Sequence, residues 1–165
     1  MKFVTSTFAV SLLLLSAFSA QAENPVTFET LLAKSAAAAS TSDWRIGASI
    51  SRQILAMPGL TKTQTAAGWS HLCTHLTNDA DFDGATVACN KSVALAPASY
   101  AGYLNRGNLL LAMGDRAGAR REYNKAVALN PTSPALSIAV SFASPASWVI
   151  PSPSDAAQLA AVPAP

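Results

Sequence analysis

The chain has 165 residues, which suits one domain, and its formal net charge is only +2. Eleven basic and nine acidic residues are too evenly balanced for a surface that binds nucleic acid or another polyanion. Half of the residues are hydrophobic, but much of this share is alanine or lies near the N-terminus, and no later apolar run is long enough to span a bilayer.

The first 22 residues have the pattern of a secretory signal peptide. Lys2 precedes an apolar core over residues 8–15, and Ala20-Gln21-Ala22 provides an A-x-A cleavage site. The alternative, a transmembrane anchor, needs a longer apolar run with less serine and threonine. We therefore expect an exported protein that is periplasmic, or else extracellular. Its mature chain would begin at Glu23, with ten basic and nine acidic residues.

Residues 23–42 form an alanine-rich lead segment. Phe28, Leu31 and Leu32 are spaced i, i+3 and i+4, which predicts a short helix. The residues that follow, 35–42, are small and polar, and we expect a linker there.

A clearer helix is predicted from Asp43 to Met57. Asp43 can cap its start, and Pro58-Gly59 ends it. We interpret residues 43–60 as the second helix of a degenerate unit that precedes the regular part of the chain.

The central part of the chain, residues 66–133, repeats itself at an offset of 34 residues. The stretch DFDGA at 81–85 aligns with DRAGA at 115–119, and NKSVALAP at 90–97 aligns with NKAVALNP at 124–131. This period with helical patterning resembles the tetratricopeptide repeat, a family whose unit is two antiparallel helices.

The family signature, W-x2-L-G-x2-Y followed by A-x3-F and P, can be located in both copies. The matching positions are Trp69, Leu72, Cys73, Leu76, Ala85, Cys89 and Pro97 in the first copy and Tyr103, Arg106, Gly107, Leu110, Ala119, Tyr123 and Pro131 in the second. The departures are arginine for leucine at 106, leucine for tyrosine at 76 and 110, and the two cysteines. The resemblance covers about 68 of the 165 residues.

The resemblance implies an all-α fold, a short array of helix-turn-helix repeats. Its units would be residues 66–99 and 100–133, with 43–60 as a half repeat in front, because such arrays need about three units. Local patterns agree with this. Asp115 can cap the last helix, Pro131 ends it, and Gly107 lets two helices approach closely.

Residues 134–165 differ from the rest of the chain and are predicted to be a mostly disordered tail. Seven of the ten prolines lie from residue 131 onward. Within the tail, Leu136, Ile138, Val140 and Phe142 alternate with small residues, as in a strand. Three interpretations stay open: a cap on the last helix, a strand added to a partner's sheet, or a loose tail resting on the domain.

Two cysteines in an exported chain predict a disulfide. Cys73 and Cys89 lie on the two helices of the first unit, each eight residues from the turn at Asp81. In an antiparallel hairpin this places them at equal height, so a bridge is geometrically reasonable. The alternative is two buried free thiols.

Other polar groups carry weaker indications of chemistry. Asp79, Asp81, Asp83 and Gly84 match the first half of a calcium loop, but its twelfth position is asparagine rather than glutamate, and a polar turn with a helix cap explains them. The basic residues Arg116, Arg120, Arg121 and Lys125 form a solvated helix face or a surface for an acidic partner.

His71 and His75, at i and i+4, have a spacing that suits zinc, but no third ligand is evident. Metal handling by these two histidines is the alternative function. The chain has no G-x-S-x-G motif, no glycine-rich phosphate loop and no carboxylate pair placed for acid–base work. We therefore predict no enzyme activity and no cofactor.

The resemblance implies a protein that binds other proteins through a groove lined by the first helix of each unit. The positions concerned are Ser70, Thr74, Thr77, Leu104, Asn105, Asn108 and Leu111. Family members that grip a C-terminal carboxylate have lysines at the positions of Ala67 and Ala101, so this groove should be neutral. We predict an exported scaffold or adaptor that binds a protein or peptide and no nucleic acid.

Overall fold

The structure is a computed structural model that describes residues 26–133. The predicted signal peptide, the start of the lead segment and the tail with its alternating stretch at 136–142 lie outside the described residues.

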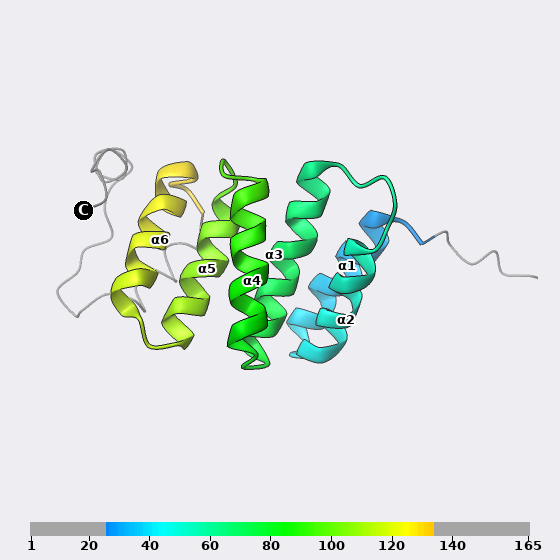
Figure 1. The fold of residues 1–165 in the computed structure, drawn as a ribbon, viewed down its shortest axis with the longest axis horizontal. Coiled ribbons are helices and arrows are strands. Elements are labelled where there is room, and N and C mark those ends of the chain that lie inside the picture. Colours follow the sequence, from blue (N-terminus) through cyan, green and yellow to red (C-terminus); the bar gives the residue numbers. More distant parts are fainter. Residues whose placement is uncertain (1–25, 134–165) are drawn as a thin grey trace, which may run out of the picture.

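Six α-helices form three antiparallel hairpins that stand side by side (Figure 1). They are α1 (Phe28–Ser40), α2 (Trp44–Leu55), α3 (Lys62–Asn78), α4 (Phe82–Leu95), α5 (Tyr100–Ala112) and α6 (Arg116–Leu129). The described part of the chain contains no strand. The prediction of an all-α array of helical hairpins is therefore confirmed.

The hairpins pack in two layers. Helix α3 contacts both α1 and α5, so the first helices of the hairpins form one continuous layer. Helices α2 and α4 do not contact each other, and each packs instead against the first-helix layer. The array consequently has a first-helix face made by α1, α3 and α5, and a second-helix face made by α2, α4 and α6.

The linker expected at residues 35–42 is wrong, because α1 continues to Ser40. Thr27 and Thr30 form a capping box at its start, and the alanines after Ser35 favour helix. Ser35 is completely buried with its hydroxyl hydrogen-bonded, so it belongs to the interior rather than to a solvated linker. The preceding unit thus has both of its helices.

Aspartates start the second helices of the two regular units in the same way. The side chain of Asp81 accepts a hydrogen bond from the Gly84 amide at 3.0 Å, and that of Asp115 accepts one from the Gly118 amide at 2.8 Å. The predicted cap at Asp115 is confirmed. In the described residues Asp81 therefore acts as a helix cap, as the repeat alignment indicates, and not as part of a long cation-binding loop.

Small residues and one covalent bond set the distances between paired helices. The ring of Tyr123 lies where a side chain at Gly107 would be, so only glycine allows α5 to approach α6 this closely. In the middle hairpin, Cys73 and Cys89 form the predicted disulfide between α3 and α4, with a Cα–Cα distance of 5.0 Å. Both cysteines are completely buried.

We expect loss of this disulfide to destabilise the fold markedly. The cysteines are 16 residues apart, and a crosslink of that span stabilises by roughly 3 kcal/mol in the chain-entropy description. Urea unfolding of the chain with Cys73→Ala and Cys89→Ala should show a free energy of unfolding lower by about this amount. As a control, a reducing agent should shift the midpoint of the wild type and leave that of the variant in place. A wild-type midpoint insensitive to reduction would contradict the prediction.

Candidate functional site

The seven side chains predicted to line a binding groove all lie on α3 and α5, but they are not equally accessible. Ser70 and Thr77 on α3 are buried, whereas Thr74 is half-buried. On α5, Asn108 is exposed, and Leu104, Asn105 and Leu111 are half-buried.

Asn105 and Ser70 contact each other across the two helices. The amide nitrogen of Asn105 donates to the Ser70 hydroxyl at 2.8 Å and approaches its backbone oxygen at 3.3 Å. The hydroxyl of Thr74 donates to the same backbone oxygen at 3.2 Å. Asn105 therefore joins α5 to α3 and holds the two hairpins in register. The groove prediction did not include this structural role.

Asn108 also has a partner inside the protein. Its side-chain oxygen accepts a hydrogen bond from the Tyr123 hydroxyl at 2.8 Å. Burial raises the pKa of Tyr123 to about 12, so this hydroxyl stays protonated and remains a donor. Of the seven predicted groove residues, Thr74, Leu104, Leu111 and Asn108 therefore remain accessible on the first-helix face without joining α3 to α5.

A small cavity of about 180 Å³ opens beside this face, between α3 and α5 at the α4–α5 turn. Its lining consists of small or hydroxyl-bearing side chains and one imidazole: Thr63, Ala66, Ala67, Ser70, His71, Ser92, Ala96, Ser99 and Ala101. Ala67 and Ala101, the positions where a carboxylate clamp would have lysine, both lie in this lining. The cavity has no charged wall, which agrees with the neutral groove expected from the sequence.

A second polar group, which we call the serine–histidine cluster, joins the first hairpin to α3. It consists of Ser35 on α1, Ser51 on α2, and His71 and His75 on α3. The Ser35 hydroxyl lies 2.9 Å from Nε2 of His75, 3.1 Å from Nδ1 of His71 and 3.0 Å from the Ser51 hydroxyl. Ser35, Ser51 and His75 are at most 1% exposed, so these bonds lie inside the protein.

The hydrogen bonds indicate where the protons around the Ser35 hydroxyl lie. Ser51 donates to the backbone oxygen of Gly47 at 2.9 Å, so towards Ser35 its hydroxyl can only accept. Ser35 has one proton, and it goes to Ser51. Both histidines must therefore donate to Ser35, His71 through Nδ1–H and His75 through Nε2–H. In the neutral form of each ring, Nε2 of His71 and Nδ1 of His75 then carry no proton.

The surroundings favour the neutral rings. Burial lowers the pKa of His71. Burial, followed by repulsion from His71, lowers the pKa of His75, and a backbone interaction with Ser35 acts in the opposite direction. Nδ1 of His75 is buried and has no hydrogen-bond partner in the described residues. A proton added there would place an uncompensated charge in the interior.

The cluster gives little support to a metal site. The nitrogens of His71 and His75 that approach each other are both used by the Ser35 hydroxyl. Within residues 26–133, no three histidine, cysteine, aspartate or glutamate side chains come together as a metal would require. The sequence did not predict this network. Ser35 and Ser51 have no distinctive sequence pattern, and their contacts form only when α1, α2 and α3 pack together.

The fold and the neutral first-helix face define a class, the helical-repeat proteins that present stacked hairpins to a binding partner. Residues 100–133 match the family model of the tetratricopeptide repeat, so this part of the chain resembles that family. A search of curated proteins found no match to this chain. Among the described helices, none has the length and apolar character needed to cross a membrane.

The serine–histidine cluster should make stability depend on pH. Both histidines have a pKa below the ordinary 6.5 in the folded chain, so the unfolded chain binds more protons. The free energy of unfolding should therefore be highest above about pH 6.5 and should decrease as the pH falls below that value. Each histidine can contribute at most about 1.4 kcal/mol per pH unit to this decrease. Chemical unfolding between pH 5 and 8, a range of about three pH units around the histidine pKa, measures this slope.

The matched control is the double variant His71→Asn and His75→Gln. The Asn amide can replace Nδ1–H of His71 and the Gln amide can replace Nε2–H of His75, so the bonds to Ser35 can persist without a titrating group. The slope near pH 6 should disappear in this variant. A slope of equal size in both proteins would show that the cluster is not its source.

Proposed function

We propose that the protein is an exported scaffold or adaptor that binds a protein or peptide partner on the first-helix face. The observation that carries the proposal is the character of this face on α3 and α5. It combines half-buried leucines with hydroxyl and amide groups, and it borders an uncharged cavity of about 180 Å³. Such a surface suits the backbone and small side chains of a neutral polypeptide rather than a charged terminus.

Binding is favoured over catalysis by the state of the polar groups. Ser35 and His75 are at the distance of a nucleophile and its base, but the Ser35 proton is directed to Ser51 and both residues are almost fully buried. A substrate would have no access to this hydroxyl. The network instead stabilises the packing of three helices.

Two features support the exported location. The pattern of residues 1–22 is that of a cleaved signal peptide. The Cys73–Cys89 disulfide is a bond that persists in oxidising compartments and is rare in the cytosol. A periplasmic chain satisfies both features, and an extracellular one is the alternative.

Leu111→Glu and Thr74→Glu should each weaken partner binding at least about tenfold, because they place a carboxylate on a neutral, partly apolar surface. The measurement is quantitative recovery of bound proteins from a periplasmic extract on the immobilised chain. Ile46→Glu, on an exposed residue of α2 in the second-helix face, is the matched control and should leave recovery of the same proteins unchanged. Equal recovery by Leu111→Glu and the wild type would contradict binding at this face.

The export prediction has its own test. Mass spectrometry of the chain recovered from the periplasm should show an N-terminus at Glu23 and a mass lower than that of the dithiol form by the two hydrogen atoms that disulfide formation removes. A chain that retains Met1, or that is found only in the cytosol with free thiols, would contradict export.

A further inference from the structure

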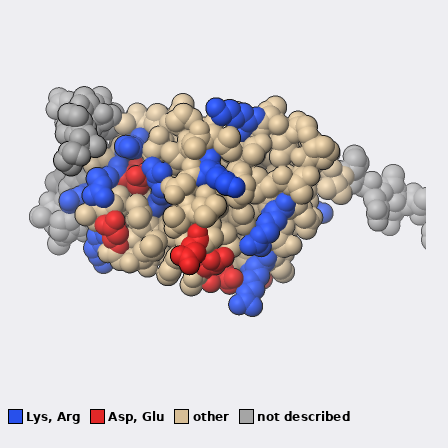
Figure 2. All heavy atoms as spheres, in the orientation of Figure 1, with Lys and Arg blue, Asp and Glu red and all other residues tan. Residues whose placement is uncertain are grey.

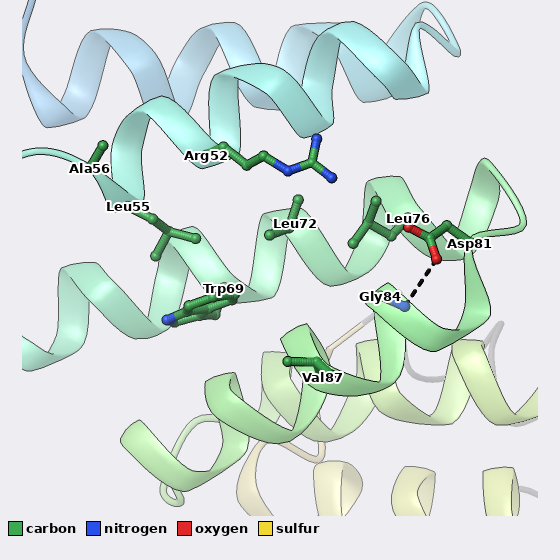
Figure 3. A pocket seen from close by; sticks show the side chains of 9 residues that line it. All are labelled: Arg52, Leu55, Ala56, Trp69, Leu72, Leu76, Asp81, Gly84 and Val87. Atoms are coloured by element: carbon green, nitrogen blue, oxygen red, sulfur yellow. Dashed lines mark hydrogen bonds between the residues drawn. The ribbon is translucent and has the colours of Figure 1, made fainter.

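The second-helix face has an open groove with a different chemistry from the first-helix face. Figure 3 shows it with α2 and α4 as walls and α3 as floor. Its volume is about 570 Å³, and apolar side chains dominate it: Leu55, Trp69, Leu72, Leu76 and Val87, with Arg52 and Asp81 at its edges. Val87 is 53% exposed, unusually high for a valine in a helix of this core.

At the corresponding place in the next unit, the side chain of Arg106 links α4, α5 and α6. Arg106 of α5 donates to Glu122 of α6 at 2.7 Å and to the side-chain oxygen of Asn90 on α4 at 3.2 Å. The side chains of Arg106 and Glu122 are mostly buried, with exposed fractions of 23% and 13%. The arginine thus spans from one wall to the other.

The repeat shows what the open groove lacks. At the offset of 34, Leu72 takes the position of Arg106 and Ala88 that of Glu122. Arg52 on α2 corresponds to Asn90 on α4, because each lies nine residues after the N-cap of its helix. The open groove therefore has an arginine on its wall, leucine on its floor and alanine in the position of Glu122, and its lining carboxylate, Asp81, is bonded to the Gly84 amide.

Arg52 is exposed and has no ion-pair partner among the residues that the structure describes. A second cation lies on the opposite wall, where the Lys91 ammonium is 4.1 Å from the ring centre of Trp69. In Figure 2 basic side chains lie over the middle of this face, and acidic ones gather at the lower edge near the α3–α4 turn. An apolar floor between two cations is complementary to an apolar stripe flanked by carboxylates.

We propose that this groove binds an acidic amphipathic helix of a partner protein, whose carboxylate pairs with Arg52. The floor residues Trp69, Leu72 and Leu76 follow one another along α3 at i, i+3 and i+7, about 10 Å in all. A partner helix that packs along α3 can place its own apolar residues at the same spacing against these three side chains. This is the usual mode by which an amphipathic helix binds a groove. The groove lies on the face opposite to the proposed scaffold surface. An experiment that refutes binding on one face therefore leaves the proposal for the other face untouched.

The test uses two labelled synthetic helices with the same leucine stripe, one with glutamate and one with lysine beside it, and the full chain. Fluorescence anisotropy should show the glutamate peptide binding about tenfold more tightly than the lysine peptide. Arg52→Glu should reverse this preference. Thr74→Glu, on the first-helix face, should change neither affinity.

The double variant Leu72→Arg with Ala88→Glu introduces the equivalents of Arg106 and Glu122. The new ion pair should fill the open groove and abolish binding of both peptides. Should that variant unfold, Val87→Glu provides a surface substitution at the rim that must weaken the glutamate peptide at least about tenfold.

Four results would overturn the proposal. They are equal affinity for the two peptides, no effect of Arg52→Glu, a dimer of the free chain that Val87→Glu dissociates, and displacement of the glutamate peptide by a peptide of residues 134–165. The third would assign the groove to a second copy of the chain, and the fourth to the chain's own C-terminal segment.

Discussion

The hydroxyl of Ser35 is the polar contact on which the packing of the first hairpin against α3 depends. It joins α1 to α2 through Ser51 and to α3 through both histidines, so one oxygen connects the first hairpin to the next. The surrounding core consists largely of alanine, glycine and serine, which bury little apolar area per residue. A short array with such a core needs specific polar contacts to hold its hairpins together, and the buried hydrogen bonds of Ser35 provide them.

The two regular units show how one scaffold can carry opposite surfaces. Arg106 fills the groove over α5 and pairs with Glu122, whereas Leu72 leaves the corresponding groove over α3 open. Most side chains differ between the units, but both are antiparallel helical hairpins whose second helix starts at an aspartate cap. The departure of Arg106 from the family signature therefore has a structural explanation: it closes a groove that its counterpart leaves available.

Much of the fold followed from the sequence, and the reasons for the exceptions are physical. The period of 34, the caps at Asp81 and Asp115 and the equal height of Cys73 and Cys89 are local or periodic features, and each appears in the structure as expected. The helix over residues 35–40 was missed because a buried serine looks polar in the sequence. The same holds for the candidate site, since the internal partners of Asn105 and Asn108 lie 35 and 15 residues away. Periodicity indicates which face a residue occupies but not which group it contacts there.

Helix α3 serves both surfaces, and this explains where the disulfide is placed. Thr74 faces the first-helix side, whereas Trp69 and Leu72 form the floor of the open groove, so any tilt of α3 would change both at once. Cys73 lies between these residues and ties α3 to α4, which supplies the wall residue Val87. The crosslink therefore fixes the hairpin that the two proposed sites share. A scaffold that binds partners on opposite faces gains most from rigidity at this hairpin, because a rigid groove does not have to be ordered again when each partner binds.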